Sequence, residues 1–343
     1  MGIATDTTAE NKKRYKALVD CYRNYDIDVL KSALQEFHAP DARFDVSQPI
    51  NGLDGAGNFI SRVVEPMTAS FAHLHRRGDI LFGGEFNGEE WVVSHGHYVG
   101  EFVRDWMGIP ASGDIVWLHY FEYHRIENGR ATRTLLFLDM LDLLRQVGRW
   151  PIDEPMGYEG FVPGPSSGDG IVLGRSDDAA SAKSLKMVDD MLQRLYTKDE
   201  AWRPFWHENM VWYGPSGYGS YVGVDGFARF QLPYESIFDP ERIRTTYRRS
   251  GDPVLDDRVK GHFARFADGN YVASGGWPSH GSFMVNDWLG VAAEGQMFTV
   301  RVADIWRRED GLLVENWVYV DVVDMLLQLG VDPWQKAGID ISP

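Results

Sequence analysis

The chain has 343 residues, 44% of them hydrophobic and 24% charged, which is typical of a soluble globular protein with room for two domains of about 150 residues. Its formal net charge is −16, and its Lys/Arg clusters are short runs such as Arg248–Arg249, so we expect no binding to nucleic acid. No apolar run approaches the roughly 18 to 20 residues that would span a bilayer, so we expect no membrane protein.

The N-terminal segment and the cysteine content indicate the compartment. The segment MGIATDTTAENKKR lacks the apolar core of a signal peptide, and we expect residues 1–12 to form a disordered tail. Cys21 is the only cysteine, which excludes internal disulfides and fits a reducing compartment. A cytoplasmic location follows as the expectation.

The first elements along the chain have helical periodicity. Apolar residues recur at helical spacing over 15–22 and again over 30–37. The segment Gly52–Gly55 is predicted to be a turn, not a nucleotide-binding loop, because it lacks the spacing of one; a third helix is predicted over 56–70.

Alternating strands are predicted next, over 90–102, 115–126 and 130–139. The pair Asn128-Gly129 predicts a tight hairpin between the last two. Helices followed by a run of antiparallel strands indicate an α+β fold, with the helices on one face of a curved sheet.

The segment 151–183 is rich in proline, glycine and serine, and is predicted to be a linker. Beyond it the same order of elements recurs, including a helical segment at Trp202–Trp206, a third helix over 227–238 and an Asp310-Gly311 hairpin. We therefore predict two domains, copy one over 13–150 and copy two over 184–336.

The two copies are related by an internal repeat. The segments that start at Asp105 and Asp287 align without a gap over 44 residues, at a constant offset of 182 positions. Both contain Asp-Trp-x-Gly, a two-residue turn ending in glycine and an Asp-x-x-Asp pair. Upstream, with small gaps, Ser94-His95-Gly96 is aligned with Ser279-His280-Gly281.

These residues resemble a known family. The run H-G…D-W-L-G…R-V-x-D-x-W-R…D-G…V-E-N-W-V…L-L-x-Q-L-G is similar to the SnoaL-like polyketide cyclase branch of the NTF2-like superfamily. The resemblance implies two tandem cones, each a bent antiparallel sheet with three helices around an apolar pocket. It also implies acid/base chemistry without a cofactor, although many members of the superfamily are not catalytic.

A two-residue turn at Asp310-Gly311 predicts which side chains share a sheet face. In copy two, Asp304 would lie opposite Trp317, on the same face as Tyr319 and Asp321. The offset of 182 transfers this face to copy one, as Glu122, Leu135, Phe137 and Asp139.

The resemblance places a general base near the end of the last long strand, where Asp139 and Asp321 stand. In an aromatic pocket such a carboxylate would be poorly solvated, with a raised pKa and greater basicity. The alternative is that both cap the helix that follows, a role that Asp142 and Asp324 would also suit. Trp317 and Tyr319 would add a stacking surface and hydrogen-bond donors in copy two.

Histidine and tryptophan provide further candidates. We predict His95 and His280 to be pocket acids or hydrogen-bond donors, the alternative being a turn shared by both copies. A metal at His95 and His97 is a weaker hypothesis, and we expect no metal and no cofactor. Trp106 and Trp288 are candidates for ligand contact, with a structural role at the cone rim favoured.

The function expected is a cofactor-free lyase or cyclase that acts on a bulky aromatic or polyketide-like molecule. The alternatives are an isomerase or epoxide hydrolase on the same fold, and a non-catalytic protein that binds hydrophobic metabolites. One copy would be catalytic and the other a scaffold, forming a pseudo-dimer within one chain that could pair further as a homodimer.

Overall fold

The structure is a computed structural model that describes residues 2–24, 26–197 and 199–339. It divides into two units, of which unit 1 takes its described residues from 1–150, 163–176 and 337–343, and unit 2 from 151–162 and 177–336. Unit 1 therefore contains copy one, and unit 2 contains copy two. Within the described ranges, no helix is both long enough and apolar enough to cross a membrane.

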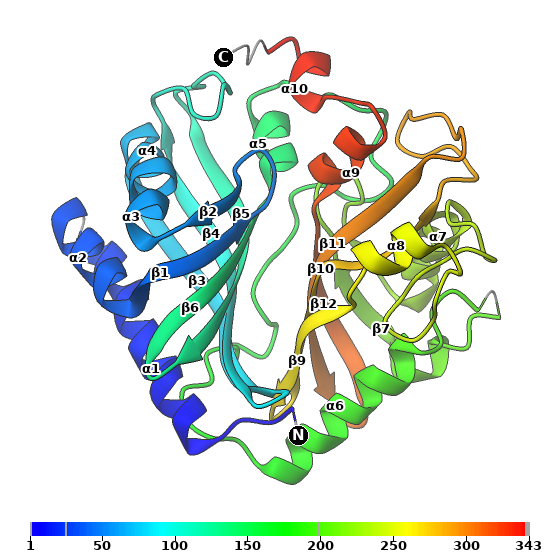
Figure 1. The fold of residues 1–343 in the computed structure, drawn as a ribbon, viewed down its shortest axis with the longest axis horizontal. Coiled ribbons are helices and arrows are strands. Elements are labelled where there is room, and N and C mark those ends of the chain that lie inside the picture. The colour runs from blue at the N-terminus through cyan, green and yellow to red at the C-terminus, as the bar shows by residue number, and fades with distance from the viewer. Residues whose placement is uncertain (1, 25, 198, 340–343) are drawn as a thin grey trace. The chain divides into compact units, whose positions relative to one another are not determined.

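In unit 1, helices α1 to α4 lie on one side of a sheet (Figure 1). The helical elements are α1 (Asp6–Cys21), η1 (Tyr22–Asn24), α2 (Ile27–Phe37), α3 (Ala56–Phe59), η2 (Ile60–Val64), α4 (Glu65–Ser70) and α5 (Met140–Gln146). The strands are β1 (His38–Val46), β2 (Asn51–Asp54), β3 (Phe71–Phe86), β4 (Glu89–Phe102), β5 (Ile115–Glu127) and β6 (Arg130–Leu138).

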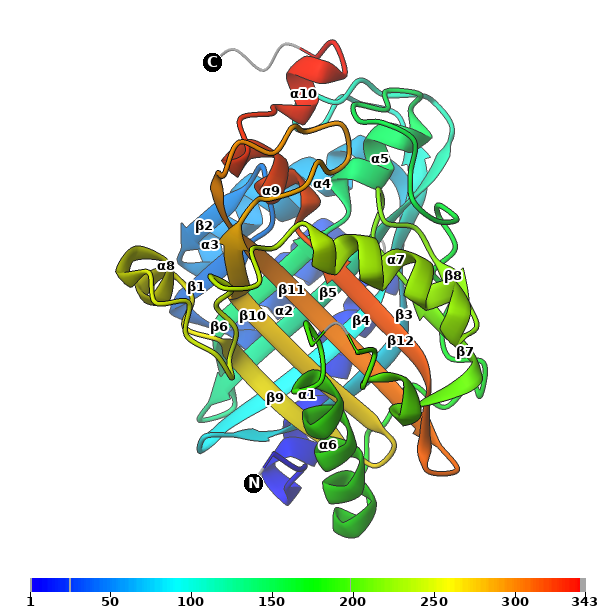
Figure 2. The ribbon, with the colours of Figure 1, turned by 90° about the vertical axis from the view of Figure 1, so that its right-hand side faces the viewer.

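In unit 2, α6 and α7 cross in front of the sheet (Figure 2). The helical elements are α6 (Asp178–Leu192), η3 (Arg203–Phe205), α7 (Val224–Ser236), α8 (Pro253–Arg258), α9 (Val322–Gln328) and α10 (Pro333–Lys336). The strands are β7 (Trp206–Tyr213), β8 (Tyr221–Val222), β9 (His262–Asp268), β10 (Tyr271–Phe283), β11 (Met297–Glu309) and β12 (Leu312–Val320).

Both sheets have the same topology. Over the described residues each is six-stranded, in the orders β2-β1-β6-β5-β4-β3 and β8-β7-β12-β11-β10-β9. Neighbouring strands are antiparallel except for β1 with β6 and β7 with β12, which are parallel. The predicted α+β tandem is confirmed, and the sheets are mixed because the first strand of each copy returns beside its last.

Two predictions about the helical segments were wrong. Residues 6–12 belong to α1, which begins at a capping box in which the side chains of Thr5 and Thr8 bind each other's backbone N–H. The segment Trp202–Trp206 contains only the single 3-10 turn η3, because β7 begins at Trp206. In addition, α6 begins at Asp178, within the range predicted to be linker, and Asp177 caps it.

The predicted hairpins are present, but each contains a bulge. Asp310 and Gly311 have φ of 47° and 85°, as a tight turn with two left-handed residues requires. Between Arg307 and Arg308 the register shifts by one, so that Asp304 pairs with Val318 and Trp317 pairs with Ile305. The β5–β6 hairpin shifts in the same way between Arg125 and Ile126. One extra residue moves all later side chains to the other face.

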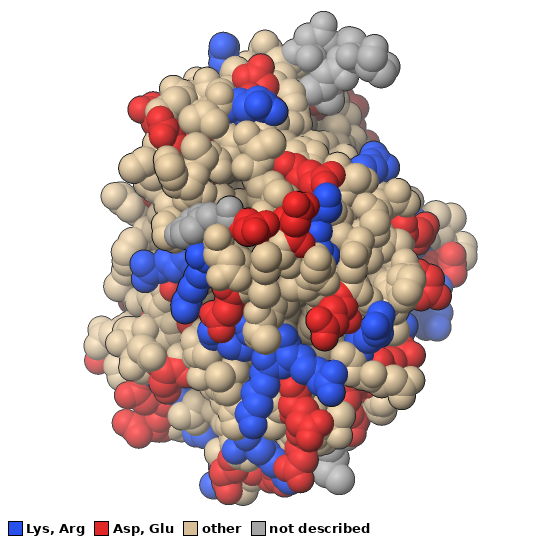
Figure 3. Space-filling model, turned by 90° about the vertical axis from the view of Figure 1, so that its left-hand side faces the viewer, with Lys and Arg blue, Asp and Glu red and all other residues tan. Residues whose placement is uncertain are grey.

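The face shown in Figure 3 is the one on which the unit 1 helices lie. Lysine and arginine side chains are interspersed there with aspartate and glutamate. Within α1, Lys16 forms a partly exposed ion pair with Asp20 at 2.6 Å. On this face, basic side chains therefore partly balance the negative charge of the acidic ones.

Candidate active site

Unit 2 contains a cavity of about 330 Å³ between α6, α7 and one face of its sheet. Small-molecule sites typically measure about 300 to 1,000 Å³, so this volume lies at the lower end of the range. Aromatic rings form much of the wall: Trp206, Trp212, Tyr218, Phe227, Phe230 and Trp306. Such a wall suits a flat, apolar ligand.

Asp304 is the only acid among the described residues that line this cavity. It lies on β11, and Val302 and Trp306 share its face because side chains alternate along a strand. Asp304 keeps some accessible surface, since it borders the cavity, but the surrounding protein separates it from bulk water. This loss of solvation raises its pKa to about 8, although neighbouring Asn316 and the charge of Arg265 act in the opposite direction.

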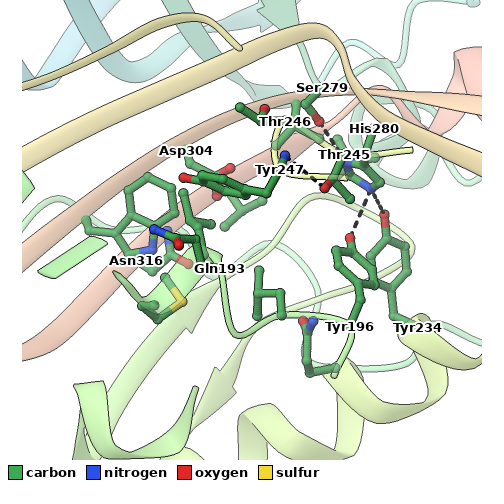
Figure 4. Close-up of a pocket in the computed structure, with 18 of the residues that line it drawn as sticks. Gln193, Tyr196, Tyr234, Thr245, Thr246, Tyr247, Ser279, His280, Asp304 and Asn316 are labelled. Carbon is green, nitrogen blue, oxygen red and sulfur yellow. Dashed lines mark hydrogen bonds between the residues drawn. The ribbon is translucent and has the colours of Figure 1, made fainter. Parts of the chain in front are cut away.

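A polar cluster occupies another part of the wall, around His280 of β10. The imidazole Nε2 lies 3.1 Å from the Tyr196 hydroxyl and 3.0 Å from the Tyr234 hydroxyl, and Nδ1 lies 2.7 Å from Ser279 Oγ. Burial lowers the pKa of His280 to about 3, so the ring is neutral near pH 7. Figure 4 shows both phenols pointing at His280, with Asp304 on another side of the cavity.

Both phenols are kept neutral and able to donate a proton. Burial, followed by the charge of Glu235, holds the pKa of Tyr196 well above its usual range. Burial and the neighbouring Tyr196 do the same for Tyr234. The charge of Asp304 contributes to both increases, so its carboxyl lies within electrostatic reach of both phenols.

In unit 1 the position equivalent to Asp304 is Glu122, and its surroundings are filled. Arg76 of β3 forms a buried ion pair with Glu122, and the Tyr15 hydroxyl donates to the same carboxylate at 2.5 Å. The Arg76 guanidinium also lies 4.6 Å from the centre of the Tyr120 ring. Burial opposes ionisation, but the charge of Arg76 holds the pKa of Glu122 well below its usual range. This carboxylate is therefore part of a packed interior.

Unit 1 has a separate cavity of about 610 Å³, formed by residues of the ranges 21–30 and 65–74. Cys21 lies on its wall, partly exposed. None of the site residues predicted from the sequence lines it. Among the residues that the structure describes, no group of three or more histidine, cysteine or acidic side chains is placed to hold a metal ion.

Comparison with known families assigns both halves of the chain. Residues 12–147 match the SnoaL-like polyketide cyclase family, and residues 188–316 match the SnoaL-like domain family. The chain is a tandem of two SnoaL-like domains. None of the curated proteins compared with the chain matches it.

Solved structures similar to the chain each cover a single SnoaL-like domain. A putative SnoaL-like polyketide cyclase from Jannaschia is 17% identical over 42% of this chain and 95% of its own, with a TM-score of 0.37. IdmH, a putative polyketide cyclase from Streptomyces antibioticus, is 18% identical over 43% and 99%, with a TM-score of 0.32. AclR, a putative hydroxylase from Streptomyces galilaeus, is 20% identical over 43% and 86%, with a TM-score of 0.35.

Asp139 and Asp321, the predicted general bases, lie outside the residues that line either cavity. Each is the N-cap of the helix that follows its strand, and accepts the backbone N–H of Asp142 at 3.1 Å or of Asp324 at 3.2 Å. Asp321 also forms an ion pair with Arg301 at 3.2 Å. In the structure, Asp139 and Asp321 therefore both have the helix-capping role that was given as the alternative to catalysis.

The bulges account for four other candidates. Trp317 and Tyr319 pair with Ile305 and Ala303, and so lie on the face of the unit 2 sheet opposite to Asp304. Leu135 and Phe137 lie opposite Tyr123 and Phe121 in unit 1, on the face away from Glu122. All four are buried, and none lines a cavity.

The tryptophans of the Asp-Trp-x-Gly motifs have a structural role. Trp106 exchanges backbone hydrogen bonds with Ile109, and Trp288 does so with Val291. The two residues between have left-handed φ in both turns, which explains the glycine. Trp288 packs behind the cavity wall, with its ring 5.5 Å from that of Tyr218.

The alignment of the two Ser-His-Gly motifs was wrong. Ser94 pairs with Glu122, and the residue that pairs with Asp304 is Ser274, not Ser279. His95 therefore lies on the face away from Glu122, where its Nε2 is 2.6 Å from that of His119. A register shift between Gly276 and His280 separates the motifs, so only His280 reaches a cavity.

Several cavity residues were missed: Tyr196, Tyr234, Gln193, Tyr247, His262 and Asn316. Tyr196 follows the end of α6 with φ of 61°, a backbone region that few residues other than glycine adopt and that no motif announces. Asn316 was missed because only the bulge turns it, with Val318, to the face of Asp304.

Proposed function

We propose that the chain is a cofactor-independent acid/base enzyme of the cyclase or lyase type, and that its active site is the unit 2 cavity. The substrate is a bulky, largely apolar aromatic or polyketide-like molecule. Membership of the SnoaL-like family supports a cyclase-type role. The observation that carries the proposal is Asp304, a carboxyl with a pKa of about 8 on the wall of an aromatic cavity.

In this proposal, Asp304 is the general base and a phenol is the electrophile. The carboxylate of Asp304 takes a proton from a carbon next to a substrate carbonyl. The hydroxyl of Tyr196 or Tyr234 donates to the carbonyl oxygen and stabilises the enolate that forms. The enolate then attacks a second carbonyl carbon to close a ring, or expels a leaving group. Protonated Asp304 returns its proton to the product oxygen or to the leaving group.

His280 is a positioning residue in this scheme. With its proton on Nδ1 and donated to Ser279, the ring accepts at Nε2 from one of the two tyrosine hydroxyls, which leaves the O–H of the other free to donate to the substrate. A neutral ring suits this role, because an imidazolium would have no acceptor for the phenols. Unit 1 is a scaffold, because its equivalent carboxylate is ion-paired in a filled interior.

The test compares Asp304→Asn with its matched counterpart Glu122→Gln. A thermal-shift screen of aromatic, polyketide-like and steroid-like compounds selects ligands, and mass spectrometry follows their turnover. Because a positioned base contributes about a hundred- to ten-thousandfold, Asp304→Asn should lower kcat/KM by that factor, while Glu122→Gln keeps turnover at temperatures at which the variant remains folded. In the wild type, kcat/KM should rise with pH to a plateau above about 8, because the reaction needs the carboxylate form.

Two outcomes would reject the proposal. Turnover that survives Asp304→Asn would show that Asp304 is not the general base. Ligands that stabilise the chain but are never turned over, by the wild type or by either variant, would instead favour a non-catalytic binding protein.

A further inference from the structure

The mouth of the unit 2 cavity is built by a segment that is much longer in copy two than in copy one. In copy one, residues 71–80 connect the end of the third helix to Leu81, the strand residue that pairs with Ser94. In copy two, residues 237–264 make the same connection to Arg265, which pairs with Ser274. The additional chain includes an irregular stretch, residues 239–252, which we call the mouth loop.

The tip of the mouth loop lies on the cavity wall. Arg244 pairs with Gly281 through two backbone hydrogen bonds, which fix the loop against β10. Thr245 and Arg248 then close a tight turn through their backbones, and all four residues from 245 to 248 line the cavity. The Tyr247 hydroxyl donates to Asp189 of α6 at 2.6 Å, which ties the tip to the opposite side of the mouth.

The mouth loop carries four arginines, and three of them are paired. Arg242 lies 3.6 Å from Asp252, while Arg244 and Arg249 lie 3.5 and 3.8 Å from Asp256. Arg248 is exposed, and no carboxylate of the described chain lies within ion-pairing distance of it. An unpaired cation is thus placed at the mouth of an apolar cavity, in a chain whose formal net charge is −16.

We propose that Arg248 determines specificity by binding an anionic group at the exposed end of the substrate, whose apolar body fills the cavity. This inference rests on the proposed function for the location of the site, but not on the role of Asp304. The hydroxyl of Thr245, which belongs to the same turn as Arg248, lines the same cavity and can donate to the same anion. The substrate is therefore an amphiphile with an apolar, aromatic body and an acidic end.

The test uses two fluorescent probes that share one skeleton. 8-Anilinonaphthalene-1-sulfonate carries an anionic group, and N-phenyl-1-naphthylamine lacks it. The wild type should bind the sulfonate more tightly, and Arg248→Ala should weaken it about fivefold, the upper range for an exposed ion pair, without changing the neutral probe. Arg248→Lys should retain most of the preference, and added salt should reduce it.

Arg249→Ala is the matched control, because Arg249 adjoins Arg248 but is paired with Asp256 and does not line the cavity. It should leave the binding of both probes unchanged. Val318→Trp, which fills the cavity, should abolish the binding of both probes, and Val302→Trp replaces it if that variant does not fold. Probe binding that survives cavity filling would overturn the proposal, since the probes would then bind elsewhere.

Three other results would overturn it: no preference for the sulfonate in the wild type, equal weakening of both probes by Arg248→Ala, or the same loss with Arg249→Ala. The preference should persist in Asp304→Asn. Failure of the acid/base proposal would appear instead as turnover unaffected by that substitution, so the two failures are distinguishable.

Discussion

The two copies place a carboxyl at the same point of the same fold and surround it differently. Glu122 pairs with Leu136 across its hairpin, and Asp304 pairs with Val318, at the constant offset of 182. Glu122 is held ionised by Arg76 in a filled interior, whereas Asp304 borders a cavity and loses a proton only near pH 8. A fold position therefore does not define a chemical role, because the partners of the carboxyl do.

The cause of the difference lies in the strand next to β4 or β10. In unit 1, β3 runs past Tyr98 and supplies Arg76 beside it. In unit 2, β9 begins at His262, opposite Gly276, and therefore stops short of His280, the counterpart of Tyr98. The mouth loop takes over there, and it contributes threonine and tyrosine to the wall in place of a buried guanidinium.

The largest expected effect is on the stability of unit 1. Arg76→Met or Glu122→Gln removes one partner of a buried ion pair and should cost about 3 to 5 kcal/mol of unfolding free energy, because the remaining group stays buried without its partner. The double variant should recover most of the loss. Chemical denaturation at pH 7 measures this, with Asp304→Asn as the control that should not destabilise. Additive losses in the double variant would contradict the coupling.

The sequence was sufficient for the fold class and the tandem organisation, because the repeat, the helical spacing and the two-residue turns are local patterns. The strands over 90–102, 115–126 and 130–139 lie where they were predicted, and the tandem domains follow from the constant offset. The sheet was not fully predictable, since the parallel return of β1 beside β6 is a long-range pairing without a local signal.

The site was less predictable than the fold, because one unpaired residue decides which face a side chain takes. The turn residues give no sign of the register shift between Arg307 and Arg308. Because of this shift, Asn316 and Val318 lie on the face of Asp304, and Trp317 and Tyr319 lie on the other face. Asp304 and His280 were among the candidates and do line the cavity. Tyr234 lies on α7 and Tyr196 lies in the turn after α6, and the positions of both over the sheet depend on tertiary packing.

A second prediction uses pH to separate the two carboxyls. Asp304 has an unfolded pKa near 3.8 and a folded pKa of about 8, so between these values the folded state holds a proton that the unfolded state has lost. Stability should therefore fall as pH rises through this window, by up to about 1.4 kcal/mol per pH unit, and Asp304→Asn should remove this slope.

Glu122 has the opposite sign. Its folded pKa lies below its usual value, so its contribution is present above about pH 4.5 and is lost as the solution becomes more acid. Glu122→Gln should thus shift stability by a constant amount between pH 5 and 9. Denaturation of the wild type and both variants across this range tests the pair. A slope that Asp304→Asn leaves intact would assign the proton to another group.

The smallest effects are expected at the two helix caps, where the copies should behave alike. Asparagine caps a helix nearly as well as aspartate, so Asp139→Asn should change stability by less than about 0.5 kcal/mol. Asp321→Asn also loses the ion pair of a buried carboxylate with Arg301, and should cost about 1 to 3 kcal/mol, while Arg301 keeps Asp324 as a partner. Both variants should keep full turnover, which mass spectrometry measures on the ligand that Asp304→Asn fails to convert. If Asp321→Asn abolished turnover without unfolding the chain, the base would lie at the end of β12, and the difference between Glu122 and Asp304 would concern packing alone.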